Sequence, residues 1–176
     1  MSELKPQLYE LFPTLIYHTP FLTKEECEMY IKCLDDVEKK SLPVVERPLY
    51  QTTFKLHLLN DTWKELSDRV IDVVNSVADH QHMIRDSFYH TNMWANIADG
   101  PGYFHQKHSH PNCFFSSIIY LRGSKVSSTV FYDPRSQLRY LPLIIQFIIL
   151  LMQTYLTFLM WQDPSQFFLL GCLMRF

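Results

Sequence analysis

The stretch "HSHPNCFFSSIIYL", residues 108–121, decides the fold class of this 176-residue chain. Its second part, 113–121, is rich in aromatic and β-branched residues and follows a Pro-Asn pair, so it predicts a β-strand. The stretches 87–97 and 128–133 have a similar composition and also predict strands, because glycine and proline punctuate the sequence between them. We therefore expect an antiparallel sandwich or barrel in this part of the chain.

Two helices are predicted ahead of these strands. Residues 23–40 begin with Thr23 and Glu26 at the spacing of a capping box. Residues 60–80 have apolar side chains at helical spacing along one face. Helices followed by short strands indicate an α+β fold, in which the helices cover and support the sheet.

Charge and cysteine content limit the classes of partner. Sixteen Lys and Arg against eighteen Asp and Glu give a net charge of −2, and no basic run exceeds two residues. We therefore expect no nucleic-acid partner. The four cysteines form no CxxC pair, and the N-terminus has no secretory signal, so a reducing, cytoplasmic location is expected.

His108 and His110 are the predicted metal ligands. On extended backbone, side chains two positions apart point to one face about 6.6 Å apart, so both imidazoles can reach one ion at about 2.1 Å from each nitrogen. On a helix they would diverge by about 200°. Pro111 favours extended backbone at His110. The alternative is that both histidines are solvated loop residues.

Four blocks of sequence resemble one known family in their order and spacing. They are "LFPTLIY" at 11–17, "MWANIADG" at 93–100, residues 108–121, and "TVFYDPR" at 129–135. Together they look like the 2-oxoglutarate and Fe(II)-dependent oxygenases with an H-x-H-P signature, which are related to the prolyl hydroxylases. The resemblance covers about residues 9–140. It implies a double-stranded β-helix (jelly-roll) core that holds Fe(II) with a facial set of ligands, leaving positions for 2-oxoglutarate and O2.

The resemblance also implies roles for three residues. His108 looks like the first iron ligand, and His110 occupies the position at which prolyl hydroxylases have a carboxylate. Tyr120 resembles the strand tyrosine that binds the far carboxylate of 2-oxoglutarate. An imidazole in place of a carboxylate removes a negative charge, which is expected to alter metal affinity and redox potential. The substrate would be a protein side chain or a small molecule.

Neighbouring residues are expected to have mainly structural roles. His105 lies three positions before His108, so on extended backbone it faces the opposite side. Cys113 is expected to be a small buried thiol rather than a third ligand. A metal role remains an alternative for His105 and Asp133. Trp94 and Asn96 are expected to pack or to form turns. Asp133 and Arg135 are expected to form a turn with a local ion pair.

The implied catalytic set is incomplete. The family supplies a distal histidine and a 2-oxoglutarate-binding arginine from a late strand, but no histidine follows His110 and Arg175 stands in no matching context. We therefore expect residues 1–140 to form an incomplete oxygenase-like domain whose C-terminal strands are missing or replaced. Three functions stay open: a dioxygenase (hydroxylase), active or inactive in this copy; a non-catalytic jelly-roll binding or structural module; and a membrane-anchored protein whose histidines bind zinc.

Residues 141–176 form an apolar tail with two interpretations. Between Arg139 and Asp163 lie twenty-three residues without a charge or a histidine. Their length suits a membrane-anchoring helix through 141–161, in which case the membrane is a partner. The preferred interpretation is a shifted reading frame, because codons permitted for the tail, read two bases later, can encode the Pro-Ser-Trp-Leu block of the family.

Overall fold

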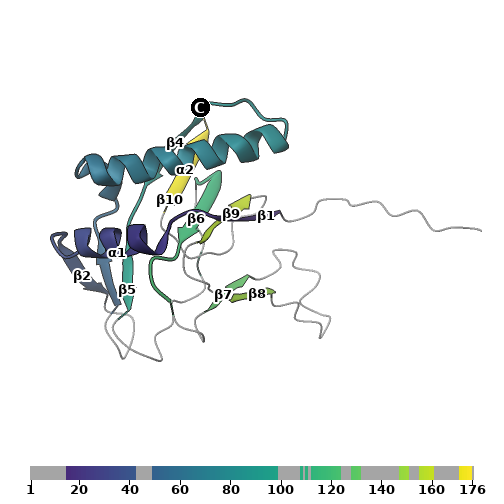
Figure 1. Ribbon diagram of the computed structural model, residues 1–176. Helices are drawn as coiled ribbons and strands as arrows, with labels where there is room; N and C mark the ends of the chain where they lie inside the picture. The colour runs from purple at the N-terminus through teal and green to yellow at the C-terminus, as the bar shows by residue number, and fades with distance from the viewer. Residues whose placement is uncertain are drawn as a thin grey trace, which may run out of the picture.

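The computed structural model describes residues 15–42, 49–98, 108, 110, 112–123, 128–131, 147–150, 155–160 and 171–175. These residues form helices and antiparallel strands (Figure 1). The jelly-roll core remains a prediction, since the strands described form separate small sheets rather than two complete facing ones.

Helix α1 (Lys24–Cys33) begins as the sequence predicts and ends earlier. The Thr23 hydroxyl accepts a hydrogen bond from the Glu26 N–H at 3.1 Å, and the Glu26 carboxylate accepts one from the Thr23 N–H at 2.6 Å. This confirms the capping box. The predicted end near residue 40 is wrong, because a turn follows Cys33 and β2 begins at Lys39. Aspartates 35 and 36 follow the helix, where its dipole disfavours negative charge.

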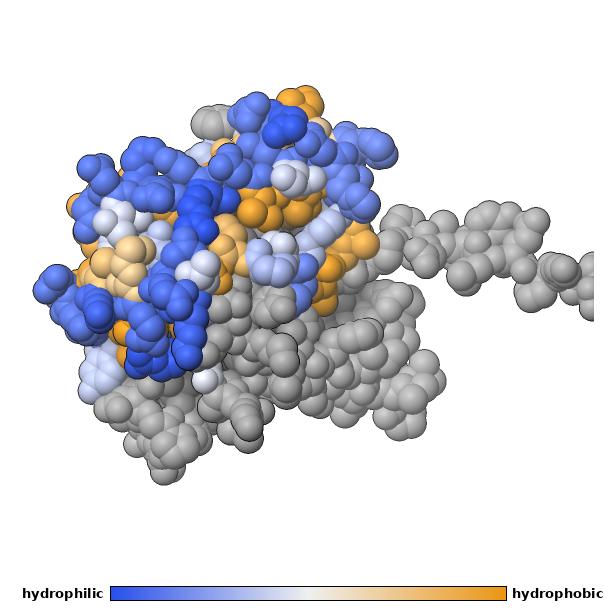
Figure 2. All heavy atoms as spheres, in the orientation of Figure 1, coloured by the Kyte–Doolittle hydropathy of each residue, from blue (hydrophilic) through white to orange (hydrophobic). Residues whose placement is uncertain are grey.

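Helix α2 (Asp61–His80) matches its prediction closely. The Asn60 side chain accepts a hydrogen bond from the Trp63 N–H at 3.1 Å and so caps the first turn. The face predicted to be apolar is buried, including Trp63, Leu66 and Val70. Figure 2 shows hydrophilic side chains over the outer faces of the helices and hydrophobic side chains between them.

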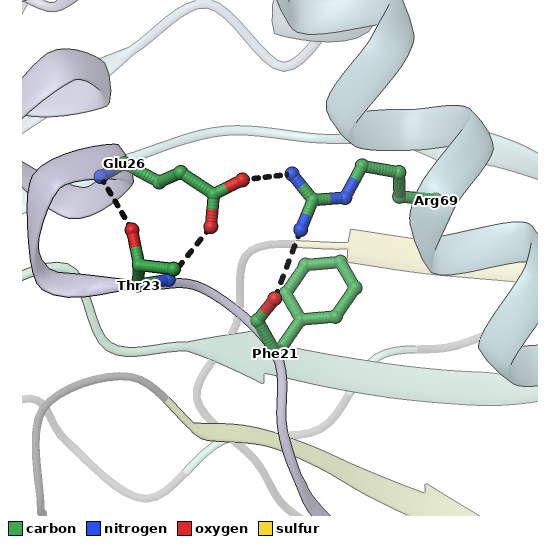
Figure 3. A network of polar contacts seen from close by, with 4 residues as sticks. All are labelled: Phe21, Thr23, Glu26 and Arg69. Carbon is green, nitrogen blue, oxygen red and sulfur yellow. Dashed lines mark hydrogen bonds and ion pairs between the residues drawn. The ribbon is translucent and has the colours of Figure 1, made fainter.

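A polar network joins the two helices (Figure 3). Arg69 of α2 forms an ion pair with Glu26 at 2.7 Å and donates a hydrogen bond to the Phe21 carbonyl oxygen at 2.9 Å. Its guanidinium carbon lies 5.1 Å from the centroid of the Phe21 ring. The Thr23 backbone N–H and Arg69 together lower the pKa of Glu26. The start of α1 is therefore fixed both to its own cap and to α2.

Thr23→Ala is expected to lower the free energy of unfolding by about 1 kcal/mol, because it leaves the Glu26 N–H without its capping acceptor. Urea unfolding followed by circular dichroism measures the change. Thr62→Ala, at a half-buried position inside α2, is the matched control and should cost less. Equal losses in the two variants would show that the cap is not important for stability.

The largest sheet has five antiparallel strands in the order β1-β9-β6-β10-β4. The strand at its centre, β6 (Phe115–Ile119), lies within the predicted strand at 113–121 and is buried at every position. The other members are β1 (Ile16–Pro20), β4 (Phe88–Asn92), β9 (Tyr155–Met160) and β10 (Gly171–Arg175). Two of the five strands thus come from the apolar tail.

Two smaller antiparallel sheets complete the described strands. One has the order β2-β3-β5 and the other pairs β7 with β8. The predicted strand at 87–97 is divided between β4 and β5, and the one at 128–133 corresponds to β7. The bounds are β2 Lys39–Leu42, β3 Leu49–Thr52, β5 Asn96–Ala98, β7 Ser128–Phe131 and β8 Phe147–Leu150, with a short 3-10 helix η1 at Leu56–Leu58.

The described parts of the tail are extended. Strand β9 pairs with β1 and β6, and β10 pairs with β6 and β4. Residues 147–150 and 155–160, inside the range considered for an anchoring helix, are strands. Among the described residues, none forms a helix with the length and apolar character needed to cross a membrane. Two strands of the large sheet, β9 and β10, thus come from the apolar tail. Whether they replace the late strands of a jelly roll stays a prediction.

One hydrophobic core lies between the helices and the large sheet. Tyr30 of α1 packs on Trp63 of α2 with ring centroids 5.5 Å apart. From the sheet, Phe115 of β6 is 0% exposed and its ring lies 5.2 Å from that of Phe88 on β4. The core thus holds β6 in place, immediately after the predicted metal ligands.

Candidate metal site

The structure brings the side chains of His108 and His110 together. Their Nε2 atoms are 3.0 Å apart, and their ring centroids are 4.8 Å apart with an interplanar angle of 79°. Neither residue lies in a helix, and both are half-buried. Two residues further on, Asn112 has φ 59° and turns the chain toward β6. The histidines therefore converge, as extended backbone at this spacing predicts.

The separation of the two nitrogens is informative about what they can bind. Two nitrogens at about 2.1 Å from one ion are about 3.0 Å apart when they occupy adjacent octahedral positions, and about 3.4 Å apart in a tetrahedron. The observed 3.0 Å fits the octahedral case. Without a metal ion, the same distance fits an N–H···N hydrogen bond, in which one imidazole donates and the other accepts. The pair could therefore hold a metal ion such as Fe(II) through both Nε2 atoms, provided that each neutral imidazole carries its proton on Nδ1.

Trp94 supports the second histidine. Its ring lies 5.5 Å from that of His110 at an angle of 45°, and the Phe54 ring lies 5.2 Å from the Trp94 ring. Trp94 is 5% exposed, so it limits the access of water to this side of His110. Asn96 accepts a hydrogen bond from Gln51 at 2.9 Å across β3 and β5. The packing role predicted for Trp94 is confirmed. Asn96 lies in strand β5 rather than in a turn, so the turn role expected for it is wrong.

A third protein ligand is not found among the residues that the structure describes, where no group of three or more His, Cys, Asp or Glu side chains could hold an ion. His105, Asp133 and Arg135 lie outside those residues. Cys113 is buried and disulfide-bonded, so the expectation of a free thiol at this position is wrong. Its sulfur lies 2.9 Å from the Phe115 carbonyl oxygen.

Tyr120 follows β6, and its hydroxyl contacts β7. The hydroxyl lies 2.6 Å from the hydroxyl oxygen of Thr129, which is buried. Burial raises the pKa of Tyr120 to about 12, so the phenol is neutral near pH 7. A neutral hydroxyl has one proton to donate and can also accept a hydrogen bond. This protonation state suits the carboxylate-binding role that the resemblance implies.

A second histidine pair, which the sequence did not indicate, lies beside α2. His90 Nδ1 on β4 is 2.6 Å from Ser67 Oγ, and the rings of His57 and His90 are 5.8 Å apart. Burial lowers the pKa of His90 to about 4, with a smaller contribution from His57, and burial also lowers the pKa of His57. Ser67 and His90 are 23 positions apart in the chain, so only the folded structure reveals this cluster.

The low pKa of His90 predicts a loss of stability in acid. An unfolded imidazole takes up its proton near pH 6.5, whereas folded His90 stays neutral until about pH 4. The unfolded state therefore binds more protons between these pH values. The contribution of neutral His90 to the free energy of unfolding is complete above about pH 6.5 and is lost by about pH 4. It amounts to about 2–3 kcal/mol.

Urea unfolding at about pH 7 and about pH 4 measures this effect. His90→Gln should lose about 2–3 kcal/mol less than the wild type over this interval. His80→Gln, at the exposed C-terminal end of α2, should lose as much as the wild type. If His90→Gln lost as much free energy of unfolding in acid as the wild type, His90 would not be the source of the acid sensitivity.

The chain matches no protein-family model and no curated protein sequence. The oxygenase resemblance therefore depends on the four sequence blocks alone. The paired imidazoles are a separate observation, because their separation is a property of the folded chain and not of the motif.

Proposed function

We propose that this domain belongs to the non-haem Fe(II), 2-oxoglutarate-dependent dioxygenases and that His108 and His110 hold the metal. The observation that supports this most is the 3.0 Å separation of the two Nε2 atoms, which suits adjacent positions around one octahedral ion. The order of the four sequence blocks supports the class. Bound Fe(II) would supply the activation of O2 and of a C–H bond, for which no side chain suffices.

The residues of the chain would bind and orient the reactants. His108 and His110 supply two neutral nitrogen donors on one side of the ion, which leaves other positions for 2-oxoglutarate. Trp94 fixes the plane of the His110 ring by packing on it. Tyr120, neutral at pH 7, would donate a hydrogen bond from its hydroxyl to the far carboxylate, exchanging its contact with Thr129 for one with the co-substrate. The substrate would be a protein side chain or a small molecule.

Release of succinate from 2-oxoglutarate tests the proposal. The full chain, supplied with Fe(II) under air, should form succinate, and it should form none without oxygen. His108→Ala should abolish the reaction, whereas His80→Ala, at the exposed end of α2, should not. Succinate formation that survives His108→Ala, or none at all in the wild type loaded with Fe(II), would contradict the dioxygenase proposal.

A second candidate is a non-catalytic metal-binding module. Two observations favour it. No histidine follows His110 in the sequence, and no third ligand is present among the described residues. Such a module would bind Fe(II) or Zn²⁺ through His108 and His110 and would leave 2-oxoglutarate unchanged. Metal binding by calorimetry, measured beside succinate release, separates the two candidates.

A further inference from the structure

A groove lies between η1, α2 and β4. It has a volume of about 880 Å³, which is within the range of ligand-binding pockets. Residues 57–61 form one end, the α2 residues from Lys64 to Asn75 form a wall, and residues 86–90 form the other side. Neither His108 nor His110 lines it.

The groove contains a buried polar atom that has no hydrogen-bond partner among the residues the structure describes. This atom is Nδ1 of His57, a residue that is 8% exposed. A buried polar group that is left unpaired costs about 1–3 kcal/mol. Its neighbour His90 is satisfied by Ser67, and both of these residues also line the groove. A ligand that donates a hydrogen bond to His57 would remove this cost.

The charge of the groove is negative. Its lining contains four aspartates and one lysine, and Lys64 is already paired with Asp68 on the same helix. Burial keeps both histidines uncharged near pH 7 by lowering the pKa of each, so they do not offset the carboxylates. Asp86 accepts a hydrogen bond from Asn75 at 3.0 Å. The aspartates are Asp61, Asp68, Asp72 and Asp86.

Exposed apolar side chains line the same groove. Leu58 is 70% exposed, Leu59 is 49% exposed and Tyr89 is 38% exposed. Single exposed apolar residues are ordinary, but three in one concave lining favour a partner that covers them. The partner must therefore combine positive charge with apolar groups.

We propose that this groove binds an extended peptide segment of a partner protein, in which a lysine or arginine stands beside apolar side chains. The cation would pair with Asp72, the apolar side chains would cover Leu58 and Leu59, and a peptide N–H would donate to His57 Nδ1. Nucleic acids and anionic lipid surfaces are excluded by the same aspartates, because like charges repel. This inference is independent of the proposed dioxygenase function.

Fluorescence anisotropy with a labelled peptide of alternating lysine and leucine tests the proposal, using the full chain at low ionic strength. The peptide should bind saturably, and the same peptide with glutamate in place of lysine should not. Asp72→Lys should weaken binding by at least about tenfold, since it replaces an attraction by a repulsion. Glu65→Lys makes the same charge change at an exposed position of α2 outside the groove, and it should change the affinity by less than about threefold.

His57→Phe keeps an aromatic ring but removes the unpaired nitrogen, so it should weaken binding by about three- to tenfold. Circular dichroism establishes that each variant is folded. If Asp72→Lys and Glu65→Lys weakened peptide binding equally, the effect would come from the net charge of the protein and not from the groove, which would overturn the proposal. Binding of the glutamate peptide as tight as that of the lysine peptide, or no saturable binding of either, would also overturn it.

Discussion

Replacing both His108 and His110 by alanine is expected to lower the affinity for a divalent transition-metal ion by more than about a hundredfold. Both nitrogen donors are lost. Mutation of a residue that only hydrogen-bonds to a metal ligand already lowers metal affinity by about 10- to 100-fold. Calorimetric titration with Co²⁺, which avoids the oxidation of Fe(II), measures the affinity. The wild type should bind one ion per chain, and the single variants should lie between the wild type and the double variant.

Two controls isolate this effect. His80→Ala removes an exposed imidazole from α2, and His57→Ala removes one from the second histidine pair; both should retain the binding of the wild type. Binding should also weaken as the pH falls, because imidazole binds a metal only in its neutral form. A double variant that binds Co²⁺ as tightly as the wild type would show that the ion is held elsewhere.

Phe115→Ala is expected to lower the free energy of unfolding by about 3–5 kcal/mol. Phe115 is 0% exposed, and its ring packs on those of Phe88 at 5.2 Å and Phe114 at 5.1 Å, so its removal leaves a cavity beneath α2. A loss of this size is a large part of the total stability of a typical domain, about 5–15 kcal/mol.

Urea unfolding measures the effect of Phe115→Ala. Ile84→Ala is the control, because Ile84 is 68% exposed and its truncation should cost less than about 0.5 kcal/mol. The central strand follows the histidine pair directly, so metal affinity should fall together with stability in Phe115→Ala. A loss below about 1 kcal/mol would mean that β6 is not part of the core.

Local sequence signals predicted the elements that depend on local interactions. The capping box at Thr23 and Glu26 fixed the start of α1, because its two hydrogen bonds join residues three apart. The apolar stripe of α2 and the β-forming composition of 113–121 predicted the elements on both sides of the core. The spacing of His108 and His110 likewise predicted their convergence, since it depends only on extended backbone.

Non-local features escaped prediction for a physical reason. A strand that is covered on both faces has a continuous apolar sequence, which hydrophobic periodicity cannot distinguish from an apolar helix. The sequence of the tail therefore did not predict strands. In the structure, β9 pairs with one edge of β6 and β10 pairs with the other. The His57 and His90 cluster was missed because its members come from η1 and β4 and meet only after folding.

The central claim is that His108 and His110 hold one metal ion, and X-ray absorption at the iron edge of the Fe(II)-loaded protein tests it most directly. We predict the outer-shell scattering of two imidazole rings, with nitrogens at about 2.1 Å from the iron and a six-coordinate environment. In the His108→Ala and His110→Ala double variant, that imidazole scattering should disappear. A wild-type spectrum without imidazole scattering, or an identical spectrum in the double variant, would contradict the claim.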